Sequence, residues 1–160
     1  MTVGGHYDIK AALLTIIAAA DSELSPQITH VIPNWRLRVW QLKKANMPVV
    51  TVRIGPMTIN ETAFGRKIRS DETGNYVSCF FTAHVWAENT TTSGVMRQQA
   101  AMNLADTIIK YLENYNGDEA TSGIAYFYDI TFRETDHESG PLRYSRIIVE
   151  GFILVKRPIS

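Results

Sequence analysis

The chain has 160 residues, of which 45% are hydrophobic and 20% charged, a composition that fits one globular domain whose core needs no metal or disulfide. Sixteen basic residues balance sixteen acidic ones, which excludes an overall electrostatic case for binding nucleic acid or an anionic membrane and leaves only a local basic patch open. Cys79 is the single cysteine, so an internal disulfide and a multi-cysteine zinc site are excluded and a reducing compartment is expected.

The first predicted element is an amphipathic helix over residues 7–20. The apolar run at residues 11–20 is also typical of a signal peptide, but Asp8 and Lys10 make a poor basic leader, so we expect the helix to pack on the domain. The run is far shorter than the ~20 apolar residues that cross a bilayer, and no other is longer, so no membrane partner is expected. The predicted buried positions are Ile9, Leu13, Ile16, Ile17 and Ala20.

The next segment, residues 27–45, is ambiguous, because residues 35–39 alternate like a strand while Trp35, Val39 and Leu42 also share a helical face. Residues 47–54 are a clearer strand, since they are rich in β-branched side chains and bounded by proline and glycine. Residues 56–65 lack periodicity and are expected to form a loop or arm.

The strongest hairpin signal follows, with a strand at residues 66–70, a polar turn at 71–75 and a long strand at 76–87. One face of the long strand is apolar and is expected to enter the core: Val77, Cys79, Phe81, Ala83 and Val85. The other face mixes large aromatic and polar side chains: Tyr76, Ser78, Phe80, Thr82, His84 and Trp86. We expect another element or another subunit to cover this second face in part.

A second helix is predicted over residues 95–114, with residues 92–94 as its capping segment. Its apolar stripe is Val95, Met102, Ala105, Ile109 and Leu112, widened by Leu104 and Ile108. Alternating strands at residues 124–132 and 143–155 close the chain, and the first is expected to place Ile124, Tyr126, Tyr128, Ile130 and Phe132 on one face.

This order of elements predicts one α+β domain spanning residues 1–160. We expect a single, mainly antiparallel β-sheet with two α-helices packed on one face, a long β-hairpin, extended loops and a C-terminal tail at residues 156–160.

No enzyme signature is present, because phosphate-binding glycine loops, zinc-protease motifs and nucleophile elbows are all missing. The cluster of Glu134, Asp136, His137 and Glu138 is expected to be a solvated loop rather than a metal site. Cys79 and His84 lie five residues apart on one strand and therefore on opposite faces, so they are not expected to form a catalytic pair. The sequence predicts no enzyme and no cofactor.

One run interleaves aromatic and basic side chains and ends in two lysines: Trp35, Arg36, Arg38, Trp40, Lys43 and Lys44. Such a run can bind phosphates and stack on bases, and it is equally typical of a protein interface rich in tryptophan and arginine. A small nucleic-acid-binding module therefore stays open as an alternative.

Across nearly the whole chain, the order of elements resembles the tail terminator, or tail completion, proteins of long-tailed bacterial and archaeal viruses. The matching elements are the helix at 7–20, the strand at 48–54, the hairpin at 66–87, the helix at 95–114 and the strand pair at 124–155. The resemblance implies a non-enzymatic virion subunit, made in the host cytoplasm, that forms a homo-oligomeric, usually hexameric, ring at the tail–neck junction. It implies contacts with the tail tube protein and with a neck or head–tail connector protein, while genome DNA passes through the lumen without being read.

The hairpin carries opposite charges close together, so in such a ring we expect it to pair with its neighbour through Arg66, Lys67, Arg69, Asp71 and Glu72. Contacts with the tube or neck are expected from the remaining loops and the tail, at Trp35, Arg36, Arg38, Trp40, Phe64, His137, Arg143, Lys156 and Arg157. Residues 27–45 are longer than a minimal terminator needs, which keeps a neighbouring neck or head-completion protein open as an alternative.

Overall fold

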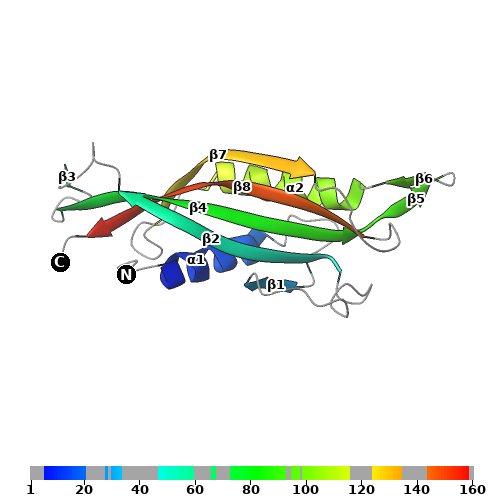
Figure 1. The fold of residues 1–160 in the computed structure, drawn as a ribbon, viewed down its shortest axis with the longest axis horizontal. Helices are drawn as coiled ribbons and strands as arrows, with labels where there is room; N and C mark the ends of the chain where they lie inside the picture. The colour runs from blue at the N-terminus through cyan, green and yellow to red at the C-terminus, as the bar shows by residue number, and fades with distance from the viewer. Residues whose placement is uncertain are drawn as a thin grey trace.

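The chain folds into two layers, a β-sheet and a pair of helices that cover one of its faces (Figure 1). The computed structural model describes residues 6–20, 28, 30–33, 47–59, 66–67, 73–92, 95–97, 99–115, 124–134 and 144–158. Its elements are α1 (His6–Ala19), β1 (His30–Pro33), β2 (Val49–Ile59), β3 (Arg66–Lys67), β4 (Thr73–Glu88), β5 (Thr90–Thr92), β6 (Val95–Arg97), α2 (Gln99–Glu113), β7 (Ile124–Glu134) and β8 (Tyr144–Pro158).

The main sheet has the strand order β1-β2-β4-β8-β7, with β3 paired to β4, and β5 and β6 form a separate two-stranded sheet. The pairs β2–β4, β4–β8 and β8–β7 are antiparallel, whereas β1 runs parallel to β2. The predicted α+β class, with a mainly antiparallel sheet and two helices, is therefore confirmed. The parallel strand β1 is an addition that the ambiguous residues 27–45 did not reveal.

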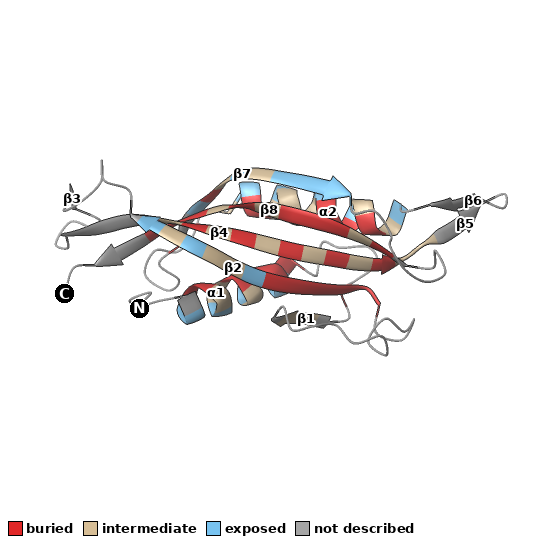
Figure 2. Ribbon diagram, viewed as in Figure 1, coloured by how far each residue is buried: buried red, intermediate tan, exposed pale blue. Residues whose placement is uncertain are grey.

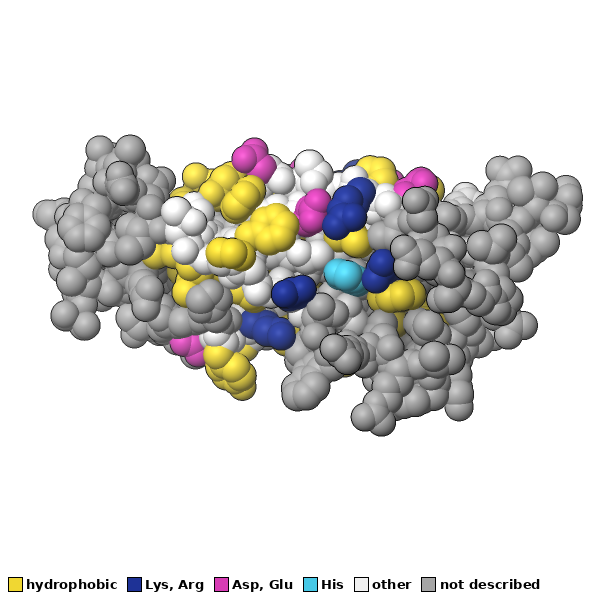
Figure 3. Space-filling model, in the orientation of Figure 1, with side chains coloured by type: hydrophobic (Ala, Val, Ile, Leu, Met, Phe, Trp, Pro, Cys, Tyr) yellow, Lys and Arg dark blue, Asp and Glu magenta, His cyan; other side chains and the backbone are white. Residues whose placement is uncertain are grey.

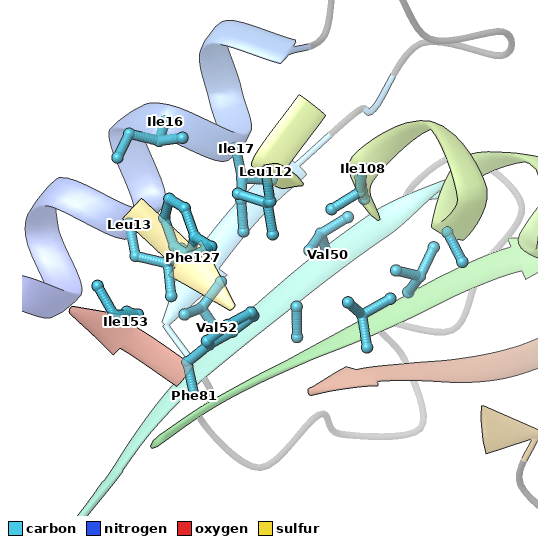
Figure 4. Close-up of a cluster of buried hydrophobic side chains, with 14 of the residues drawn as sticks. Leu13, Ile16, Ile17, Val50, Val52, Phe81, Ile108, Leu112, Phe127 and Ile153 are labelled. Carbon is cyan, nitrogen blue, oxygen red and sulfur yellow. The ribbon is translucent and has the colours of Figure 1, made fainter. Parts of the chain in front are cut away.

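Both helices contribute to one hydrophobic core on the same face of the sheet. Every predicted inward position of α1 is buried, because these positions recur every three or four residues along one side of the helix. In Figure 4, side chains of α1 and α2 converge with those of the strands: Leu13, Ile16, Ile17, Val50, Val52, Phe81, Ile108, Leu112, Phe127 and Ile153. Burial of each such side chain contributes ~1.5–3 kcal/mol to folding.

Strand β4 has the alternation that the sequence predicts. Val77, Cys79, Phe81, Ala83 and Val85 are at most 2% exposed, whereas the side chains between them are partly exposed. Figure 2 shows this as alternating red and tan along the strand. All of β8 pairs with β4, from Gly74 opposite Pro158 to Glu88 opposite Tyr144. Because directly paired residues share a face, β4 fixes which side chains of β8 enter the core.

The second helix begins later than predicted. Residues 95–97 form β6, which pairs antiparallel with β5, so the predicted helix start and the predicted cap at residues 92–94 are wrong. The physical reason is that the threonines of β5 and Val95 are β-branched and favour strand pairing. The buried stripe of α2 is shifted accordingly: Ala101, Leu104, Ala105, Ile108 and Leu112 are buried, while Met102 and Ile109 are only partly buried.

The predicted loop at residues 56–65 is wrong in its first part, because β2 continues to Ile59. The pairing with β4 shifts between Ile54 and Met57, which places Gly55 and Pro56 at an irregularity. Proline lacks an N–H donor and is tolerated in a sheet at such positions, so the strand continues past it. Residues 60–65 lie outside the described residues.

Two further boundaries differ from the prediction. Strand β8 extends to Pro158, so Lys156 and Arg157 pair with β4 instead of forming a tail. The predicted hairpin is present, since Arg66 pairs with Gly74 and Lys67 with Thr73, but β4 begins at Thr73, inside the predicted turn. Residues 68–72, which include the last three residues of the predicted first strand and the start of the predicted turn, lie outside the described residues.

The uniform alternation predicted for residues 124–132 is wrong, because β7 is irregular at two places. Its register against β8 shifts between Ile124 and Tyr126 and again between Tyr128 and Thr131. Ile124 and Phe127 are therefore both buried, whereas Tyr126 is 49% exposed. At the second irregularity Asp129 has a φ of 50°, a conformation that Asp adopts more readily than most residues.

The second irregularity explains why position 151 is a glycine, and it generates a first prediction. A Cβ on Gly151 would lie 3.1 Å from the Ile130 Cα and 3.2 Å from the Phe81 Cε1. Since the Ile130 contact is with backbone, Gly151→Ala is expected to destabilise the fold by about 1–3 kcal/mol through overpacking. The measurement is the free energy of unfolding in urea. The exposed Thr131→Ala serves as control and should change it by less than ~0.5 kcal/mol.

Candidate functional site

The residues predicted from sequence as ring or partner contacts do not form a site that the structure describes. Arg66 and Lys67 are placed in β3, and Lys156 and Arg157 in β8, but only by their backbones. The other candidates lie outside the described residues: Trp35, Arg36, Arg38, Trp40, Phe64, Arg69, Asp71, Glu72, His137 and Arg143. These contacts stay predictions.

The described residues instead assemble a surface on the sheet face that neither helix covers, here called the open face. Figure 3 looks onto it and shows basic side chains gathered around a histidine near the middle, with hydrophobic side chains beside them. Strand register gives its order, because cross-strand neighbours lie on the same side of a sheet. One row joins Thr51, His84, Ile148 and Arg133 across β2, β4, β8 and β7.

Three arginines from three strands surround His84, and we call Arg53, Arg133 and Arg146 the arginine cluster. Arg133 lies in the row of His84, while Arg53 pairs with the row of Thr82 and Arg146 with Trp86, one row to either side. Burial, as the largest cause, and the charges of Arg146, Arg133 and Arg53 together lower the pKa of His84 from its usual 6.5 to about 4. His84 is therefore neutral at pH 7.

Two contacts hold parts of the arginine cluster in place. The Arg133 Nε donates to the Glu150 Oε1 at 3.3 Å, and the two side chains are 60% and 26% exposed. An ion pair this exposed is worth at most ~1 kcal/mol, so it orients Arg133 more than it stabilises the fold. The Arg146 guanidinium lies 5.2 Å from the centroid of the Trp86 ring, a cation–π contact. Arg53 is exposed, and no described carboxylate lies within ion-pair distance of it.

An aromatic ladder adjoins the arginine cluster on the open face and consists of Phe80, Phe152, Tyr128 and Tyr126. Phe80 meets Phe152 edge to face at 5.5 Å, and Phe152 stacks on Tyr128 at 5.4 Å with 19° between the ring planes. The Tyr128 hydroxyl and the Ser78 Oγ are 2.6 Å apart, a hydrogen bond that fixes the tyrosine ring. Tyr126 continues the ladder to the edge strand β7. These rings are only partly buried, as predicted for the outward face of β4.

Two buried polar atoms next to the arginine cluster have no hydrogen-bond partner, the Thr51 Oγ1 and the Trp86 Nε1. Thr51 is 1% exposed although it lies in the row of His84. Leaving a buried hydroxyl unpaired costs ~1–3 kcal/mol. These two unpaired atoms therefore lower the stability of the fold at this end of the open face.

The predicted separation of Cys79 from His84 is confirmed. Cys79 points into the core with 0% exposure, and desolvation raises its pKa to about 11, so the thiol is not a nucleophile at neutral pH. Within the described part of the chain, no group of three or more His, Cys, Asp or Glu side chains could hold a metal ion. None of the described helices is long and apolar enough to cross a membrane.

A scan of the sequence against protein-family models finds no match, and a search of curated proteins finds no significant match.

Sequence reasoning did not identify the arginine cluster. The outward face of β4, with His84 and Trp86, was recognisable from its alternation, but the arginines lie 31 to 62 positions away in sequence from this pair and on other strands. The usable signal was the alternation within residues 143–155, which sets Arg146 on the opposite side of the strand from Ile147, Val149 and Ile153. Even this signal says only that Arg146 faces away from the core.

A second prediction concerns the pH dependence of stability. Because the pKa of His84 is lower in the folded chain than in the unfolded one, only the unfolded chain binds this proton between pH 6.5 and about 4, so stability falls as the pH falls through that window. Allowing for solvent screening, this loss is expected to be about 1 kcal/mol. His84→Gln, which keeps a neutral polar side chain, should lose less stability between pH 7.5 and 4.5 in urea titrations.

The comparison between wild type and variant cancels the contribution of other groups that titrate in the same window. An identical loss of stability in both proteins would contradict a neutral, desolvated His84.

A third prediction concerns the unpaired hydroxyl of Thr51. Thr51→Val keeps the β-branched shape and removes a buried polar atom without a partner, so the variant should unfold at equal or higher denaturant, with a gain of about 1 kcal/mol. Thr58→Val, on the exposed part of β2, is the matched control and should change stability by less than ~0.5 kcal/mol. A clear loss in Thr51→Val would show that the hydroxyl has a partner.

Proposed function

We propose that the chain is a structural subunit of a long-tailed virus particle. It assembles with copies of itself into a ring, most simply a hexamer, that terminates the tail tube and joins it to the neck. Its partners are then the tail tube protein and a neck or connector protein, with genome DNA passing through the lumen. The carrying observation is the open face, a sheet surface with a four-ring aromatic ladder that no described element of the chain covers.

The architecture supports this proposal because it agrees with what the resemblance implies. A helix, a long strand, a hairpin, a second helix and a closing strand pair follow one another as expected, and both helices cover one face of the sheet. Such a subunit has one face to build its core and a second face that neither helix covers, which we propose for contacts with other chains. Rings form when a contact between two different surfaces repeats around an axis and closes.

The chemistry of the described residues supports a structural function as well. The thiol of Cys79 is buried and protonated, and His84 is separated from it by the sheet. The most distinctive side chains are aromatic residues and arginines, which are the types enriched where proteins meet. A neighbouring neck or head-completion protein of the same virion fits these observations as a second form of the proposal.

Assembly state tests the proposal directly, and this is the fourth prediction. Native mass spectrometry over a concentration series, with negative-stain imaging, should show a closed ring with a central hole for the chain alone or with a tail tube protein. Arg66→Glu should weaken ring formation while the monomer stays folded, because Arg66 belongs to the charged hairpin. Lys110→Glu, an exposed charge reversal on α2, is the matched control and should assemble normally.

A monomer at every concentration, with and without tube protein, would overturn the ring. Normal assembly of Arg66→Glu would remove the hairpin from the interface and leave the ring itself in place.

A further inference from the structure

We propose that helix α1 of one copy of the chain packs on the aromatic ladder of a second copy. The inference rests on the proposed function, because it names the two surfaces that meet where neighbouring subunits of the ring touch. The residues of α1 that make the contact point away from the core, and we call them the outer face of α1: Tyr7, Ala11, Thr15 and Ala18.

The outer face of α1 lacks the polar side chains of a helix side that meets water. Its four residues recur every three or four positions and are all exposed, with Tyr7 at 82%. Residues 11–19 contain no charged side chain, and the Thr15 hydroxyl donates to the Ala11 carbonyl oxygen at 3.0 Å within the helix. A helix that is apolar on all sides is typical of one that is buried on all sides.

Helix α2 shows the usual solvent-facing side in the same chain. The residues that it exposes are all polar or charged: Gln99, Asn103, Asp106, Lys110 and Glu113. Both helices pack on the same face of the sheet and share one core, so their contacts with the sheet do not explain the difference. The difference indicates a second contact on the outer face of α1.

The aromatic ladder matches this face in polarity and in shape. The two rows of strand register that hold its rings, through Phe80 and through Ser78, contain no charged side chain among the described residues. The nearest charges in register are Arg53 and Glu150, one row away, and Asp129 is exposed at the irregularity of β7. The small side chains of the outer face leave room for rings that stand out from a sheet, so the two surfaces can pack closely.

The charges at the margins are complementary as well. By helical position Asp8 and Lys10 flank the outer face on either side, and Arg53 and Glu150 lie beside the ladder, so each margin carries both signs. Asp8 and Glu150 already have contacts within their own subunit, and an ionised carboxylate accepts from more than one donor. Charges in such a polar rim set the orientation of a contact more than its affinity.

The two surfaces lie back to back on the same part of the sheet. Leu13 of α1 shares the core with Phe127 and Ile153 (Figure 4), whereas Phe152, the neighbour of Ile153 in β8, belongs to the ladder on the other side. A second copy stacked on the open face therefore brings its own α1 over the ladder. Contacts between two different surfaces repeat from copy to copy, and they close into a ring when each step includes a suitable rotation.

The size of the contact predicts its strength. A 14-residue helix is ~21 Å long, and one side of it buries less than the ~800 Å² per partner of a standard interface. We therefore expect a weak, concentration-dependent contact between two copies that becomes stable when it repeats around a ring.

The fifth prediction concerns self-association of the full chain, measured by sedimentation velocity over a concentration series. Ala18→Glu keeps a strong helix former at an exposed position and places a carboxylate in the apolar contact, so association should weaken by about tenfold or more. Asn103→Glu adds the same charge to the exposed side of α2 and should associate like the wild type. Circular dichroism must show both variants folded, and Ala11→Glu replaces an Ala18→Glu variant that unfolds.

Cross-linking tests which surfaces meet. A mixture of Ala11→Cys and Tyr126→Cys copies, treated with a short bismaleimide, should form a mixed dimer, whereas either variant alone should not, because the two surfaces are different. The native Cys79 is 0% exposed and does not compete for the reagent. Asn103→Cys mixed with Tyr126→Cys is the matched control and should give no product.

Wild-type association of Ala18→Glu overturns the proposal, and so does a wild type that neither associates nor cross-links in this way. Cross-linking of Ala11→Cys to itself contradicts it too, because two α1 helices would then meet. So does a variant that loses only the binding of a tail tube protein, since α1 would then contact the tube. A closed ring formed by Ala18→Glu removes this contact and leaves the proposed function in place, whereas open chains cross-linked through these surfaces confirm the contact and contradict the ring.

Discussion

The pairing of β4 with β8 is the constraint on which the rest of the structure depends. The whole length of β8 is in register with β4, and β2 and β7 attach to the two sides of this pair. Side chains alternate strictly along β4, so one face of the strand is buried in the core and the other belongs to the open face. A slip of one residue would turn Phe81 outward and His84 into the core. The burial of the core side therefore fixes the position of each group on the open face.

Much of the fold was predictable where the signal is local and periodic. The buried positions of α1 and the inward face of β4 followed from helical and strand periods alone. The start of α2 was not predictable from sequence, because the residues before Gln99 have no pattern that excludes a helix. Only the pairing with β5 makes β6 a strand. Similarly, β1 is four residues long and is defined by its parallel partner β2. Such elements depend on tertiary pairing, which a local pattern does not contain.

The open face was predictable from sequence on β4 but not on β2 and β7, because the strand alternation of both is interrupted. On β7, uniform alternation from Tyr128 would put Phe132 on the open face and Arg133 on the helix side. The irregularity between Tyr128 and Thr131 exchanges them, so Arg133 pairs with Ile148 and Phe132 with Val149. The irregularity at Gly55 and Pro56 has the same effect on β2, where Arg53 and Thr58 share a face despite their odd and even positions. Extra residues of this kind are set by packing, as the close approach of Ile130 to Gly151 shows.

The arginine cluster also shows how the two faces are linked energetically. The like charges around His84 repel one another. In the structure the imidazole is neutral, Arg133 is paired with Glu150, and Arg146 lies over the ring of Trp86. These contacts reduce the repulsion and leave Arg53 exposed, while Thr51 and Trp86 each keep an unpaired buried polar atom. The hydrophobic side chains on the opposite face offset these costs, because they hold β2, β4, β8 and β7 in the register that brings the charges together. A core built for stability alone would not require this arrangement, and for that reason our proposed contacts with other chains rest on the open face.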